Sequence, residues 1–360
     1  MTESEACVAF NLTAKIGSVS ALNAKLECGS LAAAWENLPN KSSRSGGQVN
    51  VEREYELAEK YNIKIVTMVD DEYPEMLKNT PGRPLVLYVK GSLEALNKPS
   101  VAIIGTRRAS EYGLSQASRF GYDLAKDGWS VVSGLALGID AASHRGALDA
   151  DGVTVGVLGS ALDRFYPEKN RELAREIIEK NGAVISQFPF GRGADTQTFP
   201  MRNHVVAGLA GGVIAIECPH KSGTLITTSI AADLGRVVMA VPGRLDNPLC
   251  SGCLSLIRDG AILVRGSKDV MLAMGATKPK KEEDDLFNQP QVELKLPSVS
   301  PEEALIMNAL SVDPITIDEV VERTGLDISQ VNSLCMMLRV KDRIEFLSGN
   351  RVSLPRRRMN

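Results

Sequence analysis

The chain has 360 residues, of which 44% are hydrophobic and 24% are charged, and its formal net charge is −3. That length exceeds what one hydrophobic core usually serves, so we expect two or three ordinary globular domains. We expect a soluble, cytoplasmic protein without a membrane partner, because no apolar run approaches about 18 residues and the first residues do not resemble a signal peptide.

The cysteines do not indicate a disulfide framework or a metal site. Six cysteines are scattered along the chain, as is usual in a reducing compartment. Cys250 and Cys253 form one C-x-x-C pair, but a zinc site needs a second pair or two suitably spaced histidines. The whole chain holds three histidines. We therefore expect structural thiols, no metal and no cofactor.

Residues 1–45 are expected to form a small helical domain. A turn at Ile16 and Gly17 precedes an amphipathic run to Leu26, and a further helix follows Ser30. Two interpretations remain open. One is a degenerate helix-hairpin-helix, whose turn amides can hold a DNA phosphate. The other is a packing domain, which the single turn glycine favours.

Residues 50–274 are expected to form a Rossmann-like α/β core with a mostly parallel sheet. Strand patterns alternate with helix patterns, which predicts βαβ units covered by helices on both faces. Ligands of such sheets bind beyond the carboxyl ends of the strands. The expected strands are 63–68, 85–89, 101–104, 130–133, 153–158, 183–186, 212–216, 237–240 and 261–264, and the expected helices are 51–60, 112–127, 139–150, 170–181, 202–210, 224–234 and 252–259.

A linker is expected at 275–299, where polar and charged residues leave little to bury. Residues 300–355 are expected to form a winged helix, since Ser300, Pro301 and Glu303 make a strong helix start. Helices at about 316 and 328–339 and a two-stranded element at 344–346 and 351–354 complete it. Segment 301–354 holds 5 basic and 9 acidic residues, a net of −4 that only the tail 356–358 offsets. A groove-reading helix normally lies in a basic surround, so we hypothesise a protein-interaction role.

The turns that follow the core strands carry residues suited to anions. Gly105, Thr106, Arg107 and Arg108 follow the strand at 101–104, where a glycine admits a phosphate and an arginine can grip its oxygens. This turn is not G-x-G-x-x-G, so a dinucleotide site is not supported. Similar turns occur at Ser133 and Gly134, at Arg202 and Asn203, and at Ser222, Gly223 and Thr224 beside Lys221.

A further loop combines Phe165 and Tyr166 with Lys169 and Arg171. This mixture suits single-stranded nucleic acid, because bases stack on rings while cations follow the backbone. Catalytic motifs are missing: we find no paired carboxylates at the turns, no G-x-S-x-G and no Walker lysine. His144 is expected on a helix as a structural residue. The sequence therefore predicts binding without an evident reaction.

These motifs, in this order, resemble the DprA/Smf family. The matching stretches are DEYPEML at 71–77, LYVKG at 87–91, VAIIGTR at 101–107, SGLALGID at 133–140, ASHRGAL at 142–148, FPMRN at 199–203, SGTLIT at 222–227 and GRVVMAVPG at 235–243. The resemblance implies a dimeric single-stranded DNA binder that is not an enzyme. It implies a protein that protects DNA and loads the RecA recombinase on it, as in natural transformation, with single-strand-binding protein as another partner.

The resemblance also implies roles for particular residues. Arg107 would grip a phosphate, Lys169 or Arg171 would add a second cation, and Phe165 or Tyr166 would offer a stacking face. The family often has a basic residue where Leu137 stands, usually Glu where Gln187 stands, and usually Arg where His204 stands. These departures would change individual contacts, and His204 would make the site acid-sensitive below about pH 6.5. The residues expected to line the same pocket are Gly105, Thr106, Arg202, Asn203, Ser222 and Gly223.

Two other functions remain as alternatives. One is a nucleotide-processing hydrolase on a related fold, although the turn at 221–228 lacks the Glu that such enzymes place after their glycines. The other is a nucleotide-sensing scaffold that holds a mononucleotide. Release of free base would identify the first, and competition between nucleotide and oligonucleotide would identify the second.

Overall fold

The computed structural model describes residues 1–14, 16–44, 47–220, 222–275, 300–311, 313–341, 343–347 and 349–354. The chain divides into two compact units, Met1–Lys280 and Lys281–Asn360. The expected linker, from residue 276, and the tail 356–358 lie outside the described residues. No described helix is long and apolar enough to cross a membrane.

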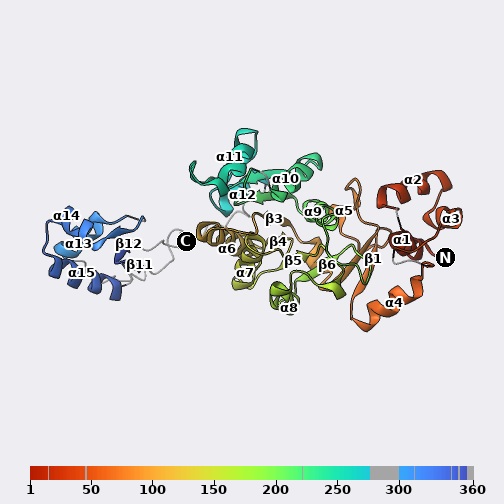
Figure 1. The fold of residues 1–360 in the computed structure, drawn as a ribbon, viewed down its shortest axis with the longest axis horizontal. Coiled ribbons are helices and arrows are strands. Elements are labelled where there is room, and N and C mark those ends of the chain that lie inside the picture. The colour runs from red at the N-terminus through yellow and green to blue at the C-terminus, as the bar shows by residue number, and fades with distance from the viewer. Residues whose placement is uncertain are drawn as a thin grey trace, which may run out of the picture. The chain divides into compact units, whose positions relative to one another are not determined.

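The first unit is built on a nine-stranded sheet of order β1-β2-β6-β5-β4-β3-β7-β8-β9 (Figure 1). Strands β3 to β9 are mutually parallel, while β2 pairs antiparallel with β6, and β1 with β2. The strands are β1 (Lys64–Thr67), β2 (Val86–Gly91), β3 (Ser100–Ile104), β4 (Ser130–Ser133), β5 (Thr154–Val157), β6 (Ala183–Ser186), β7 (Gly212–Ala215), β8 (Val237–Ala240) and β9 (Ile262–Leu263). The predicted Rossmann-like, mostly parallel sheet is confirmed.

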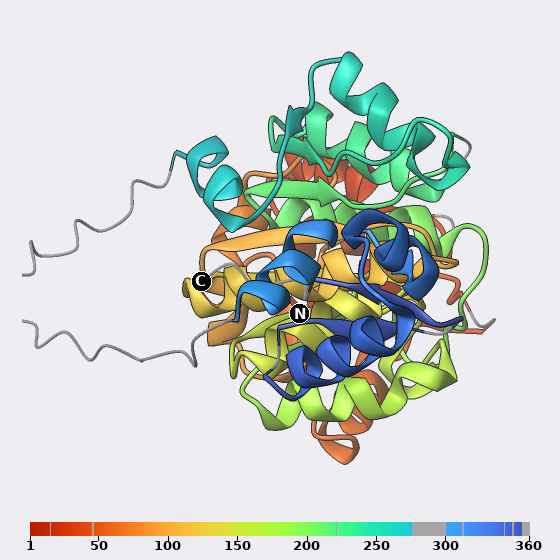
Figure 2. The same cartoon turned by 90° about the vertical axis from the view of Figure 1, so that its left-hand side faces the viewer.

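Helices cover both faces of this sheet, because its central strands are apolar on both sides. The yellow-green helices α6 to α8 lie on one face, and the green and teal helices α9 to α11 lie on the other (Figures 1 and 2). The chain order reverses beside β3, which has β4 on one side and β7 on the other. This is the switch point at which such sheets bind ligands. The helices are α5 (Glu75–Lys78), α6 (Glu111–Lys126), α7 (Ile139–Asp149), α8 (Arg171–Glu179), α9 (Thr198–Leu209), α10 (Gly223–Asp233), α11 (Ser251–Arg258) and α12 (Ser267–Ala273).

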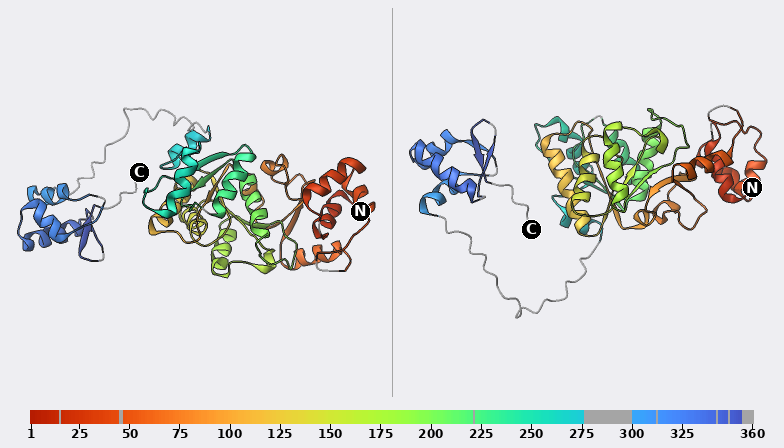
Figure 3. Two further views of the ribbon diagram at one scale, coloured as in Figure 1. Left: turned by 45° about the horizontal axis from the view of Figure 1, so that its top comes forward. Right: turned by 90° about the horizontal axis from the view of Figure 1, so that it is seen from below.

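The first 60 residues form four helices: α1 (Glu3–Leu12), α2 (Ser18–Cys28), α3 (Leu31–Glu36) and α4 (Val51–Lys60). The red helices lie beside the orange strands β1 and β2 (Figure 3), with which they share one hydrophobic cluster. Within it the rings of Phe10 and Trp35 meet edge to face at 5.5 Å. These helices therefore extend the core, and the boundary at residue 45 stays a prediction.

The second unit is a three-helix domain with a small sheet, as the winged-helix prediction required. Its helices are α13 (Pro301–Ala309), α14 (Ile317–Thr324) and α15 (Ile328–Val340). Ser300, Thr316 and Asp327 each close a capping box. The two expected strands, β11 (Glu345–Leu347) and β12 (Arg351–Ser353), are joined by β10 (Ile315–Thr316), which the sequence prediction missed.

His144 lies on α7 as a buried structural residue. Its Nδ1 lies 2.6 Å from Oγ1 of Thr154, which donates to the carbonyl of Val131 at 2.6 Å. Because the hydroxyl proton goes to Val131, the imidazole must donate through Nδ1, which leaves Nε2 unprotonated and buried. Burial, with a contribution from the charge of Arg202, lowers the pKa of His144 from 6.5 to about 3.

This buried imidazole is expected to make folding sensitive to acid. Below pH 6.5, His144 binds a proton in the unfolded chain but not in the folded chain. The free energy of unfolding therefore decreases as the pH is lowered, by at most about 1.4 kcal/mol per pH unit. His144→Asn keeps a donor for Thr154 and removes the titration, so its unfolding free energy should vary less between pH 6.5 and 4. Urea unfolding measured by the fluorescence of Trp35 and Trp129 checks this. The same dependence of the unfolding free energy on pH in the variant and the unmodified protein would contradict this prediction.

Candidate nucleic-acid interface

A small pocket lies beyond the carboxyl ends of β3, β4 and β5, where their loops meet the start of α9. Its volume is about 30 Å³. The loop after β3 contributes Arg107, and α9 contributes Phe199 and Arg202. The loop after β4 contributes Gly134, Ala136 and Leu137, and the loop after β5 contributes Gly159, Tyr166 and Pro167. The structure thus brings together four residues predicted for the site, which are Arg107, Gly134, Tyr166 and Arg202.

A cation and two rings form the open part of this pocket. The guanidinium of Arg107 lies over the ring of Phe199 at 4.6 Å, and the ring of Tyr166 lies 6.2 Å from the same ring. Tyr166 is 49% exposed and Arg107 is exposed as well. A positive charge and aromatic faces therefore reach solvent at one place.

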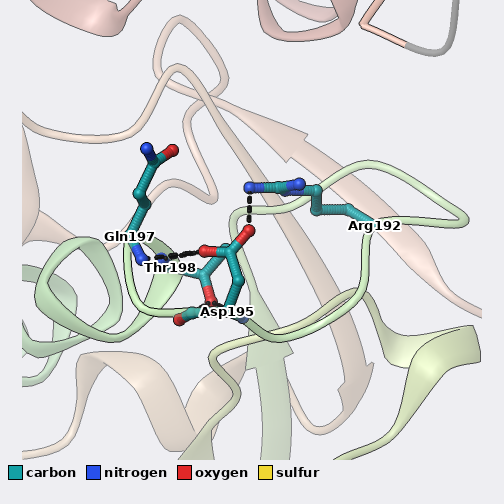
Figure 4. A network of polar contacts seen from close by, with 4 residues as sticks. All are labelled: Arg192, Asp195, Gln197 and Thr198. Atoms are coloured by element: carbon teal, nitrogen blue, oxygen red, sulfur yellow. Dashed lines mark hydrogen bonds and ion pairs between the residues drawn. The ribbon is translucent and has the colours of Figure 1, made fainter.

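The position of Phe199 depends on the loop that precedes α9. Asp195 accepts hydrogen bonds from the amides of Gln197 (2.8 Å) and Thr198 (2.9 Å) and pairs with Arg192 at 2.5 Å (Figure 4). These amide bonds, and Arg192, hold the pKa of Asp195 below its ordinary value. Capped in this way, α9 begins at Thr198, four residues before its predicted start. Phe199 therefore belongs to the first turn of a helix and is held beside Arg107.

Arg202 forms part of the pocket wall, and its guanidinium is bonded within the protein. It is 5% exposed, and Nη1 donates to the carbonyls of Gly134 and of Val157, the latter at 3.0 Å. A Cβ on Gly134 would lie 1.8 Å from Nη1, so any larger residue there would displace the guanidinium from this position. Burial lowers the pKa of Arg202 and raises that of Asp140, each opposed by the charge of the other. The prediction of Arg202 as a DNA contact is revised, since its guanidinium is occupied by the protein.

Ser133 also has a structural role. It is fully buried, and its hydroxyl donates to the carbonyl of Ile103 at 2.6 Å, joining β4 to β3. Because this hydroxyl is buried against the neighbouring strand, the predicted DNA contact of Ser133 could be made only by its main chain.

The loop after β5 carries two further predicted cations, Lys169 and Arg171. Arg171 makes a two-pronged pair with Glu168 at 2.5 and 2.7 Å and lies 5.2 Å from the ring of Phe165. Lys169 is exposed beside them. Glu168 offsets the charge of Arg171, so Lys169 is the better candidate for a second phosphate contact.

The other predicted residues do not line this pocket. Arg108 is exposed, and its amide donates to Oγ1 of Thr106 at 3.2 Å. Asn203 accepts from Nε of Arg202 at 3.0 Å. Ser222, Gly223 and Thr224 start α10 after β7, where Ser222 caps the helix, and Lys221 lies outside the described residues.

The three family departures have different positions. Leu137 lines the pocket, so an apolar side chain stands beside Arg107. Nε2 of His204 lies 2.8 Å from the carbonyl of Pro81, outside the pocket lining. The amide of Gln187 is buried. Leu137 is therefore the departure that bears directly on the pocket.

Cys250 and Cys253 are buried in the fold, and the described residues contain no cluster of metal-binding side chains. The sequence prediction missed Phe199 as a site residue. The feature that could have identified Phe199 is an aromatic residue before a proline, in the segment that already contained Arg202 and Asn203.

The comparisons with known proteins agree with this fold. A family model for DNA recombination-mediator protein A matches residues 64–275, and one for the DprA winged helix domain matches residues 290–350. Protein Smf of Escherichia coli is 34% identical over 302 residues, which cover 83% of this chain and 79% of that protein.

Two solved structures are similar as well. DprA from Streptococcus pneumoniae aligns with a TM-score of 0.62 and 31% identity over 76% of this chain and 98% of its own. DprA from Helicobacter pylori, solved to study its single-stranded DNA binding mode, aligns with a TM-score of 0.53 and 28% identity over 59% and 95%. The chain therefore belongs to the DNA recombination-mediator protein A family, the DprA/Smf proteins.

Proposed function

We propose that this chain binds single-stranded DNA at the carboxyl edge of its parallel sheet and delivers it to the RecA recombinase. The observation that carries the proposal is the guanidinium of Arg107 on the ring of Phe199, beside the exposed ring of Tyr166. A single strand offers both unstacked bases and phosphates to such a surface, whereas the bases of a duplex are stacked on one another.

The pocket itself favours a polymer over a mononucleotide. Sites that enclose small ligands usually have volumes of about 300–1,000 Å³, and this pocket has about 30 Å³. A base can stack against its mouth but cannot be enclosed. The nucleotide-sensing scaffold is therefore the weaker proposal.

The lining also argues against a hydrolase. The described residues that form the pocket carry no carboxylate, imidazole or thiol. Two carboxylates at the neighbouring turns are engaged by the backbone: Asp140 accepts from the amides of Gly134 and Ala136, and Glu217 from that of Ser110. We propose a binding protein rather than an enzyme.

Phe199→Leu tests the proposal, because it keeps an apolar side chain and removes the ring. We expect affinity for a labelled single strand to fall about tenfold, as the loss of one stacked base implies. The same variant should bind an abasic strand as tightly as the unmodified protein, because that strand has phosphates and no bases. Equal losses on both strands, or displacement of the strand by thymidine monophosphate, would contradict polymer stacking.

The homodimer implied by the resemblance is supported by apolar residues at one edge of the sheet. Ile262 and Leu263 of the edge strand β9 are 43% and 42% exposed, and Leu272 of α12 is 81% exposed. An exposed edge of this kind commonly pairs with another chain. Sedimentation equilibrium should give a dimer, and a monomer at all concentrations would contradict it. RecA and single-strand-binding protein remain proposed partners, which pull-down with each purified protein would test.

We propose that the winged helix binds a protein rather than duplex DNA. The surface of α15 presents Ile328, Met336 and Met337, each at least 50% exposed. Its basic residue Arg339 lies over the ring of Phe346. Tight binding of fragment 296–360 to duplex DNA at physiological salt would contradict this role.

A further inference from the structure

Glu217 is a fully buried carboxylate at the end of β7, directly beside the turn that carries Arg107. Its Oε2 accepts from the amide of Ser110 at 2.9 Å, and its Oε1 accepts from the hydroxyl of Ser110 at 2.5 Å. The same hydroxyl accepts from the amide of Gly113 and so caps α6. Glu217 thereby fixes the residue at which the turn ends and the helix begins.

Glu217 also holds the other end of this turn. Its main-chain carbonyl accepts from the amide of Thr106 at 2.8 Å. The two anchored residues, Thr106 and Ser110, enclose Arg107 and Arg108 between them. One residue, two positions after β7, therefore fastens both ends of the short segment that projects these two arginines.

The surrounding sequence leaves room for this arrangement. A Cβ on Gly113 would lie 2.3 Å from Oε2 of Glu217, so a larger residue there would displace the carboxylate from Ser110. On the opposite side, the amide of Ile139 at the start of α7 donates to the carbonyl of Thr106 at 3.3 Å. The segment 106–110 is thus held between the switch-point strand β7 and helix α7.

We propose that Glu217 is a positioning residue for DNA binding, which presets the turn 106–110 so that Arg107 meets a phosphate without first being ordered. The inference rests on the proposed function. A buried anion behind a phosphate-binding turn would by itself repel DNA, so its presence needs a compensating reason. A preset turn supplies that reason. Ordering a flexible loop weakens binding by the free energy that the ordering costs, whereas a turn already fixed in the folded protein does not incur this cost on binding.

The chain offers sharp variants for a test. Glu217→Gln replaces one of the two carboxylate oxygens by an amide NH₂ group, so the charge-assisted hydrogen bonds from Ser110 become weaker neutral ones. Glu111→Gln is the matched control, since it removes the same charge from an exposed residue one position beyond Ser110. Ser110→Ala removes the hydroxyl that donates a hydrogen bond to Glu217. Ser110→Thr keeps a hydroxyl at the cap of the helix.

The experiment measures affinity of the full chain for a labelled single strand, together with hydrogen exchange of the segment 105–112. We expect Glu217→Gln and Ser110→Ala to weaken binding about tenfold and to speed exchange in this segment, while Glu111→Gln and Ser110→Thr bind like the unmodified protein. In an Arg107→Ala background, Glu217→Gln should have no further effect on affinity.

The possible results separate this inference from the proposed function. If Arg107→Ala weakens binding while Glu217→Gln binds normally, positioning by Glu217 is wrong and the proposed function stands. An equal loss from Glu217→Gln with and without Arg107 would also overturn positioning, because Glu217 would then act elsewhere. If the unmodified protein fails to bind a single strand, the proposed function fails first, and the inference falls with it.

Discussion

Arg107→Ala is expected to weaken single-stranded DNA binding by about 10- to 100-fold, the effect of one lost hydrogen bond between charged groups. The side chain is exposed at the pocket and lies over Phe199, so its loss removes a cation without opening the core. The slope of log affinity against log salt should also become shallower by about 0.7, as one phosphate contact on a single strand implies. Fluorescence anisotropy across a salt series measures both quantities.

Arg258→Ala is the control for this prediction. Arg258 ends α11, which runs antiparallel to the strands and so ends at the opposite edge of the sheet, and its side chain is 77% exposed beside Asp259. The variant removes the same charge from the protein and should bind DNA normally. An equal loss from both variants would mean that only net charge matters.

Arg202→Met is expected to lower the free energy of unfolding by roughly 3 kcal/mol, although a site prediction from sequence would expect a loss of binding instead. The change leaves the carbonyls of Gly134 and Val157 without their donor and removes the cation that acts most strongly on the buried Asp140. Buried groups that lose their partners are costly. Urea unfolding followed by Trp35 and Trp129, both of which lie in the first unit, measures the loss.

Arg202→Lys separates charge from geometry. Lysine keeps the positive charge but has a single nitrogen, so it cannot occupy both the position of Nη1, which donates to the two carbonyls, and that of Nε, which donates to Asn203. It should therefore recover only part of the lost stability. A variant Arg202→Met that unfolds like the unmodified protein, yet binds DNA weakly, would show that Arg202 is a contact residue after all.

Most of the core could be predicted from the sequence because its strands are continuous apolar runs between turn residues. The strands at 130–133, 183–186 and 237–240 have the predicted bounds. The start of α9 could not be predicted in this way. Its cap depends on Asp195, whose position is fixed by a pair with Arg192 across a loop. The two-residue strand β10 was missed because it exists only through pairing with β12.

The edge of the sheet at which the pocket lies could be predicted from the sequence, but the surroundings of the individual residues could not. Ser133 at the end of a predicted strand, Arg107 in the turn after one and Arg202 at a predicted helix start were all assigned to DNA binding from the sequence. Their roles differ because Ser133 points into the sheet, Arg202 reaches backbone carbonyls, and Arg107 remains exposed. Such differences depend on the direction in which each side chain points, and this direction cannot be inferred from the spacing of residues along the chain.

The most direct test of the central claim is anisotropy of a labelled single strand, and of the matching duplex, with the unmodified protein across a salt series. We predict tight binding of the single strand that weakens steeply with salt, and much weaker binding of the duplex, because stacking on Phe199 and Tyr166 requires free base faces. Equal affinity for both forms, or no binding of the single strand at low salt, would contradict the account.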